Sequence, residues 1–198
     1  MRIVIAAVIA CAAVAARPAG AQSLEAAVHF SAAQWSEFDE GDRGVGGRVT
    51  WRAMPAVGVD AELTWYPSDF VSERASFSRQ RVEGLFGVSI GPRLNRIRPF
   101  AKGAAGFLKI SPPDAALACI AIFPPPLACV LAGGRTLPAI EIGGGLIVDA
   151  TDRTFLRADI GQRLLRYPGP TLTDGFVRRN EDFYGGALRF TLGGGIRF

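Results

Sequence analysis

The sequence contains few of the residues on which most enzymatic and metal chemistry depends. Its 198 residues include one histidine, three cysteines and two lysines. With one histidine and no Cys-X-X-Cys motif, no ligand set for zinc is available, and neither a metal nor a cofactor is expected. Charged residues make up 20% of the chain and hydrophobic residues 49%, a composition that excludes a disordered chain. The length suits a single domain.

The chain also lacks an apolar run long enough for a membrane-spanning helix. The longest run, residues 3–16, falls short of the roughly 20 residues that such a helix needs. It follows the basic Arg2 and precedes the small residues Ala19-Gly20-Ala21, the pattern of a cleaved secretory signal. We therefore expect a signal peptide at 1–21 and one domain at 22–198. Cleavage leaves 20 basic and 18 acidic residues, a balance that gives no case for nucleic-acid binding.

Two cysteines, Cys119 and Cys129, remain after the predicted cleavage. In an exported chain such a pair suggests one disulfide. Both lie in an uncharged stretch, 115–132, in which prolines 124–126 exclude a continuous helix. We expect a chain reversal at the prolines, with the disulfide joining its two arms. The surrounding loop, 111–137, is the first candidate for binding a surface ligand.

After residue 21 the hydrophobicity alternates with a period of two, and no segment has a helical apolar stripe. Connections between the alternating segments are long and short in turn, as expected for transmembrane barrels with short periplasmic turns and longer external loops. The sequence therefore predicts an all-β fold, an eight-stranded antiparallel up-and-down transmembrane β-barrel. The expected strands are 24–35, 45–53, 58–66, 80–91, 98–110, 138–149, 154–165 and 183–198, and the expected long loops are 36–44, 67–79, 111–137 and 166–182.

The alternation also separates the charges onto one face of each strand. The apolar face carries one charge, Lys109, whereas the other carries eight basic and seven acidic residues. Ten of these are predicted to form an interior charge network: Arg48, Asp60, Glu62, Arg81, Glu83, Glu141, Arg157, Asp159, Arg163 and Arg189. The remaining five are Glu25, Arg52, Lys102, Asp149 and Arg197.

A soluble, lipocalin-like barrel would have the opposite arrangement, with the charges in water and the apolar face inside. Three features favour charges inside. The polar face is nearly neutral, as buried charges require pairing. Its cations are almost all arginines, which pair with carboxylates through a planar fork. The apolar face is rich in small residues and places Trp51 and Trp65 near strand ends, where membrane barrels have aromatic girdles.

The strand–turn–strand segment 142–159 resembles a hairpin of the outer-membrane protein β-barrel family, the small OmpA/OmpX-like eight-stranded barrels. The last strand ends on the aromatic Phe198 and has apolar residues, such as Ile196, at alternate positions. The resemblance covers 22–198. It implies a bacterial outer-membrane location reached through the periplasm, and contact with outer-membrane lipid and lipopolysaccharide. It also implies that Phe198 and Ile196 form a C-terminal signal for the barrel assembly machinery.

Candidates for chemistry are few. The tripeptide His29-Phe30-Ser31 is similar to the His-x-Ser arrangement of lipid A deacylase barrels, but those enzymes present the pair to lipid. Here the alternation places His29 and Ser31 inside, on the same face as Glu25, so no catalytic residue is expected. Asp60 and Glu62 are interpreted as ion-pair members rather than as an acid–base pair. Glycine runs 143–145 and 193–195 are not followed by helices, so they indicate close strand packing rather than phosphate loops.

The loops hold the remaining candidates. Acidic residues of the first loop are expected to be solvated rather than to bind a divalent cation, and Arg178 and Arg179 of the last long loop could meet lipopolysaccharide phosphates. We predict a non-enzymatic structural or surface-interaction protein that acts through its loops. A narrow passive channel for small solutes and a lipid-modifying enzyme are the alternatives. Eight strands leave an interior just wide enough for side chains, which argues against the channel. The acidic residues of the first loop, 36–44, are Glu37, Asp39, Glu40 and Asp42.

Overall fold

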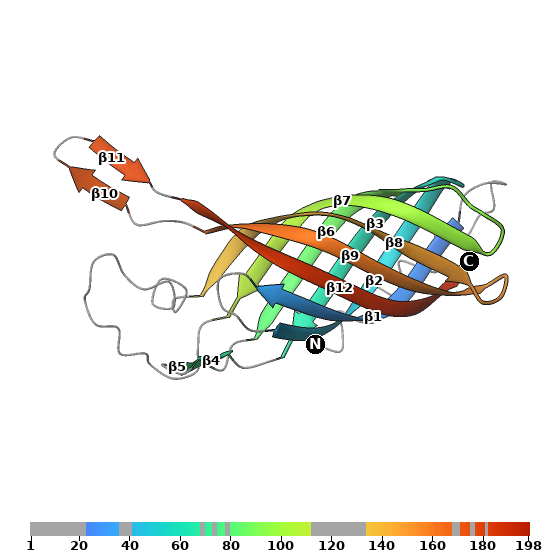
Figure 1. Ribbon diagram of the computed structural model, residues 1–198, viewed down its shortest axis with the longest axis horizontal. Helices are drawn as coiled ribbons and strands as arrows, with labels where there is room; N and C mark the ends of the chain where they lie inside the picture. The colour runs from blue at the N-terminus through green and yellow to red at the C-terminus, as the bar shows by residue number, and fades with distance from the viewer. Residues whose placement is uncertain are drawn as a thin grey trace.

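The computed structural model describes residues 23–35, 41–67, 70–72, 75–77, 80–111, 134–167, 171–174, 177–180 and 182–198. These residues form a closed antiparallel barrel of eight strands (Figure 1). The order around the barrel is β1-β12-β9-β8-β7-β6-β3-β2, and β2 pairs with β1 to close it. The strands are β1 (Ser23–Trp35), β2 (Gly41–Met54), β3 (Val57–Tyr66), β6 (Arg81–Ile90), β7 (Ile97–Ile110), β8 (Arg135–Asp149), β9 (Thr154–Tyr167) and β12 (Phe183–Arg197).

Each predicted strand is present, so the predicted fold class is confirmed. Three strands are longer than predicted: β2 begins at Gly41 rather than at 45, β8 begins at Arg135 rather than at 138, and β9 ends at Tyr167 rather than at 165. Two small hairpins were not predicted. Strands β4 (Phe70–Ser72) and β5 (Ala75–Phe77) pair within the second long connection, and β10 (Thr171–Asp174) and β11 (Val177–Asn180) pair within the last.

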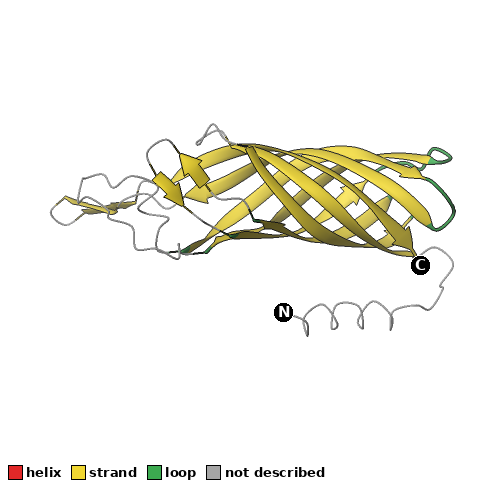
Figure 2. Cartoon of the chain, turned by 90° about the horizontal axis from the view of Figure 1, so that it is seen from below, coloured by secondary structure: helices red, strands yellow, loops and turns green. Residues whose placement is uncertain are grey.

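The two ends of the barrel differ. At one end, which we call the turn end, short connections join β2 to β3, β6 to β7 and β8 to β9, and residues 23 and 198 lie there too (Figure 2). At the other, the loop end, the β10–β11 hairpin projects beyond the wall (Figure 1). The β6–β7 turn is tight: Leu94 and Ile97 exchange backbone hydrogen bonds of 2.8 and 2.9 Å. Asn95 has a φ of 56° there, a conformation that asparagine tolerates better than most residues.

Several predicted features lie outside the described residues. They are the signal at 1–21, the acidic residues Glu37, Asp39 and Glu40, and most of the loop 111–137, including Cys119 and Cys129. The disulfide therefore stays a prediction. Arg178 and Arg179 lie in β11. Within the described part of the chain, no helix is long and apolar enough to cross a membrane.

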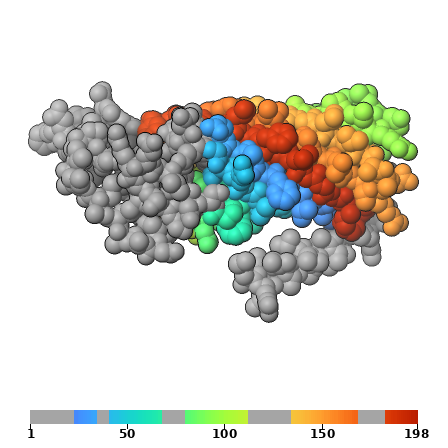
Figure 3. Space-filling model, turned by 60° about the horizontal axis from the view of Figure 1, so that its bottom comes forward, coloured from blue at the N-terminus to red at the C-terminus, as the bar shows by residue number. Residues whose placement is uncertain are grey.

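The two faces of the wall differ as the alternation predicts. Outward side chains are large, apolar and exposed, such as Val28 (73%), Phe30 (72%) and Ile142 (67%). Inward charged side chains such as Glu141 and Arg163 are fully buried. Figure 3 shows the outer surface along one side, where β12 (red) lies beside β1 (blue). The inverted arrangement, with charges inside, is therefore the observed one.

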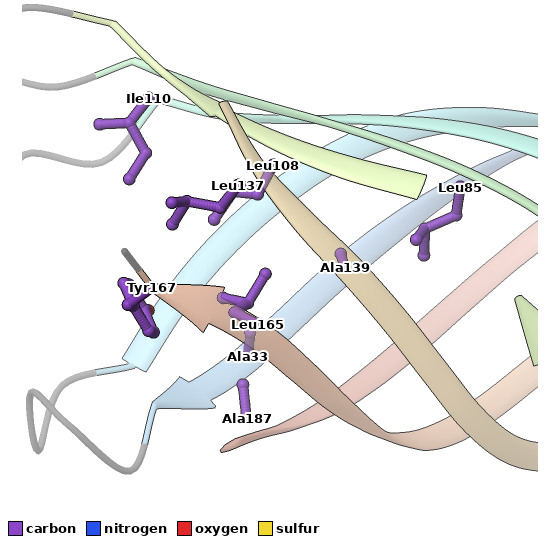
Figure 4. Packing of buried hydrophobic residues seen from close by; sticks show 9 residues of the cluster. All are labelled: Ala33, Leu85, Leu108, Ile110, Leu137, Ala139, Leu165, Tyr167 and Ala187. Atoms are coloured by element: carbon purple, nitrogen blue, oxygen red, sulfur yellow. The ribbon is translucent and has the colours of Figure 1, made fainter. Parts of the chain in front are cut away.

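Buried apolar side chains form two clusters inside the barrel. The larger cluster is formed by inward side chains of β1, β6, β7, β8, β9 and β12, and it includes Leu108, Leu137, Leu165 and Tyr167 towards the loop end (Figure 4). Near the turn end, Phe100, Ile147 and Phe155 form the smaller cluster. Charged side chains share the interior with both clusters, from the Arg81–Asp42 pair near the loop end to Arg52 and Glu25 near the turn end, and we call these inward charges the charged layer.

Candidate functional site: the charged barrel interior

The loop-side part of the charged layer is built from inward residues of six strands. Arg189 of β12 pairs with Glu62 of β3, and its Nη1 lies 3.1 Å from Oε2 of Glu141 on β8. Arg163 of β9 pairs with Glu83 of β6. Lys102 of β7 reaches Oε1 of Glu141 at 2.6 Å. These groups are at least 92% buried, so each charge depends on its partners rather than on water.

In the central part of the charged layer, Arg48 and Arg157 link strands that are not neighbours in the barrel wall. Nη2 of Arg48 lies 2.6 Å from Oε2 of Glu62 and 2.7 Å from Oδ2 of Asp159. Arg157 binds Oδ1 of Asp60 and Oδ1 of Asp159, each at 3.0 Å. Two hydroxyl groups also donate hydrogen bonds to these carboxylates: Thr50 donates to Asp60 at 2.5 Å, and Thr191 donates to Asp159 at 2.7 Å.

Nine of the ten predicted network residues meet in this continuous cluster, and the tenth, Arg81, pairs with Asp42 of β2. Nη2 of Arg81 lies 2.5 Å from Oδ1 of Asp42 near the loop end. The interpretation of Asp42 as a solvated loop residue was therefore wrong. Because β2 starts at Gly41, Asp42 lies in the strand with the same inward parity as Arg48, and it is 4% exposed.

At the turn end, three arginines converge on Glu25. Its Oε1 accepts hydrogen bonds from Nε of Arg52 at 2.8 Å and from Nε of Arg197 at 2.9 Å, and Nη1 of Arg98 lies 3.6 Å away. Arg98 was missed as an interior residue, although its position has the same parity as Lys102 on the same strand. The predicted strand begins at Arg98, and this first residue was not assigned to either face of the strand.

The His29-Phe30-Ser31 tripeptide lies in β1 with its polar side chains inside. Nε2 of His29 lies 3.0 Å from Oγ1 of Thr64 and 3.4 Å from Oε1 of Glu62. Ser31 bonds to Oη of Tyr66 at 3.1 Å and accepts from Nε of Arg189 at 3.0 Å. Both side chains are buried within the lumen, so neither faces lipid. Their partners Glu62 and Arg189 belong to the charged layer.

One cavity in the described part of the interior is very small. A cavity lined by Arg48, Asp60, Lys102 and Arg157, with Gly87 in its wall, has room for about one water molecule. Among the described residues, no group of three or more His, Cys, Asp or Glu side chains is placed to hold a metal ion. The geometry of the lumen is therefore that of a packed polar core. Its chemical capacity is to hold the wall together through ion pairs between distant strands.

Comparison with known proteins supports the fold. No family model matches the sequence, and no curated protein matches it. Among solved structures, the N-terminal β-barrel domain of OprF from Pseudomonas aeruginosa superposes with a TM-score of 0.51 at 14% identity, covering 88% of this chain and 97% of that one. Neisserial surface protein A superposes with a TM-score of 0.55 at 10% identity, covering 89% and 97%. The chain thus has the fold of the small eight-stranded outer-membrane β-barrels, as its sequence resemblance predicts.

Proposed function

We propose that this protein is a non-enzymatic outer-membrane barrel whose closed interior makes it a rigid scaffold for its external loops. One observation carries the proposal: buried ion pairs and two apolar clusters occupy the described interior, and the cavity beside Arg48 and Arg157 has room for about one water molecule. A protein that moved solutes would need a continuous wet path, and eight strands enclose space for little more than their own side chains.

The outward face supports placement in a membrane. Aliphatic and aromatic side chains that would be costly to hydrate cover it, including Phe86 (63% exposed) and Leu156 (58%). Trp51 and Trp65 are exposed near opposite ends of the barrel, where an aromatic girdle meets the lipid headgroups. We place the loop end outside the cell and the turn end in the periplasm, with export directed by the signal at 1–21. Recognition of Phe198 and Ile196 by the assembly machinery belongs to the same proposal.

The loop end is the expected site of interaction. The β4–β5 and β10–β11 hairpins add regular structure to two of the long connections. Arg178 and Arg179 lie in β11 and are the candidates for contact with lipopolysaccharide phosphates. The loop 111–137 is the candidate for a surface ligand, because its uncharged stretch needs an apolar surface to cover it.

Planar-bilayer recording tests the scaffold against the channel. The full chain, folded in detergent and inserted into a bilayer, should give no stable open-state current above that of the bilayer alone. Insertion is verified in the same preparation by protease resistance of the barrel. A large, long-lived conductance from protein shown to be inserted would contradict the closed scaffold and favour the passive channel.

A further inference from the structure

The turn end of the barrel carries more positive than negative charge. Six arginines lie there against three side-chain carboxylates, those of Glu25, Asp149 and Asp152. Four of the arginines form one cluster with two of these acids, which we call the turn-end arginine cluster: Arg52, Arg93, Arg98 and Arg197 with Glu25 and Asp149. In the central part of the charged layer, by contrast, a single arginine such as Arg157 binds two carboxylates.

Arg98 is the least compensated member of this cluster. It projects from β7, which lies four strands from β1 in either direction around the barrel, so its side chain crosses the lumen towards Glu25. It is 4% exposed, yet its Nε and Nη1 make no hydrogen bond. Nη2 of Arg52 is also buried without one. Buried donors on a charged group are costly when they have no acceptor, so an anion bound beside Arg98 would lower this cost.

The cluster is continuous with the aqueous surface. Nη2 of Arg197 lies 3.0 Å from Oδ1 of Asp149, and Nη2 of Arg93 lies 3.1 Å from Oδ2 of the same carboxylate. The Arg93 side chain is half-exposed. Arg96 in the β6–β7 turn and Arg153 in the β8–β9 turn are also exposed. Backbone hydrogen bonds hold both turns against the barrel: the N–H of Asp149 donates to the O of Arg96, and the N–H of Arg197 donates to the O of Arg153, each at 2.7 Å. Guanidinium groups joined through the carboxylates of Asp149 and Glu25 therefore run from the surface to Arg98.

We propose that the turn-end arginine cluster binds a phosphate group. Planar guanidinium forks match phosphate oxygens, and basic residues next to a bilayer favour anionic headgroups. Because the cluster lies within a few residues of the strand ends, the phosphate can come from an anionic phospholipid or from a soluble molecule. A water molecule alone would satisfy the free Oε2 of Glu25 but would leave the excess positive charge uncompensated.

The test measures whether phosphate stabilises the folded full chain. In neutral detergent micelles, the urea midpoint is followed as sodium phosphate replaces sodium chloride at constant ionic strength, which yields a dissociation constant by linkage. A second arm compares vesicles of phosphatidylcholine with and without phosphatidylglycerol in phosphate-free buffer. Arg98→Met removes the central donors. Arg93→Gln and Arg166→Gln form a matched pair: their side chains are 51% and 54% exposed, and each is paired with one aspartate, but at opposite ends.

Wild type and Arg166→Gln should be stabilised equally, whereas Arg98→Met should raise the dissociation constant by about tenfold or more. Arg93→Gln should raise it by a smaller factor, and this variant decides the matter if Arg98→Met does not fold. Stabilisation by free phosphate identifies a soluble ligand, and stabilisation by phosphatidylglycerol alone identifies a lipid headgroup. No stabilisation in either arm, or an equal loss in Arg166→Gln, would overturn the proposal.

Discussion

Arg189 shows how a single side chain can hold several strands together. Its guanidinium group reaches the carboxylates of Glu62, Glu83 and Glu141, and it also donates to Ser31 and Thr64. These partners lie on β1, β3, β6 and β8, whereas Arg189 itself lies on β12. Removing this cation would leave three buried acids with one partner fewer each, in a layer where water has little access.

Replacing Arg189 with methionine should therefore lower the free energy of unfolding by about 3–5 kcal/mol, the range for breaking a buried ion pair. Arg166→Met is the control, because Arg166 is exposed and pairs with one aspartate at the loop end. Urea unfolding of both variants in the same detergent measures the difference. Equal midpoints for wild type and Arg189→Met would mean that the lumen is filled with water that screens these charges.

The inward position of most of these residues could be predicted, because parity alone decides which face of a strand a side chain occupies. Their partners could not. Arg157 and Asp60 are separated by 97 residues and meet only because the barrel closes with a particular stagger, which the alternation does not encode. Asp42 and Arg98 were missed for a simpler reason: both lie within two residues of a strand end, where predicted boundaries are least exact.

At the scale of the strand, glycines permit β8 and β9 to approach closely. A Cβ added at the inward Gly143 would lie 2.3 Å from O of Ile160 and 2.6 Å from Cα of Gly161, both of which are backbone atoms. A Cβ at the outward Gly103, on the neighbouring strand β7, would meet nothing within 4 Å. The same residue type is therefore required for packing at one position and free to change at the other.

Gly143→Ala should lower the free energy of unfolding by roughly 1–3 kcal/mol, because the backbone of β9 would have to shift. Gly103→Ala should leave it unchanged or raise it slightly, since alanine loses less backbone entropy on folding. Thermal or urea unfolding of the pair checks this. A loss of the same size at Gly103 would show that the glycines act through chain entropy rather than close packing.

The outward faces of the strands can be tested in the same way. Ile160 lies near the middle of β9 and is 53% exposed. In a bilayer, Ile160→Arg should cost about 2–4 kcal/mol, because the charge would lie near the midplane. Leu94→Arg, in the β6–β7 turn, is the control and should change little. Unfolding in lipid vesicles measures both, and full tolerance of Ile160→Arg would contradict the placement of this outward face in the bilayer.

For the whole molecule, the alternating connection lengths predicted the order and direction of the strands, because an up-and-down meander has few alternative topologies. The two apolar clusters of the interior were not foreseen. Parity distinguishes inward from outward, but the height of an apolar or charged side chain depends on strand tilt. The apolar cluster at the loop end also uses Leu137, which precedes the predicted start of β8, and Tyr167, which follows the predicted end of β9.

Orientation in the membrane is the property of the whole barrel on which the proposed function depends. Gln80 is exposed at the loop end, just before β6, and Asp152 is exposed in the β8–β9 turn. In a background carrying Cys119→Ser and Cys129→Ser, a thiol reagent too large to cross the outer membrane should label Gln80→Cys on intact cells. It should label Asp152→Cys only after the outer membrane is permeabilised. The opposite pattern would place the arginine-rich turn end outside the cell, where its phosphate partners would be those of lipopolysaccharide rather than of the periplasmic leaflet.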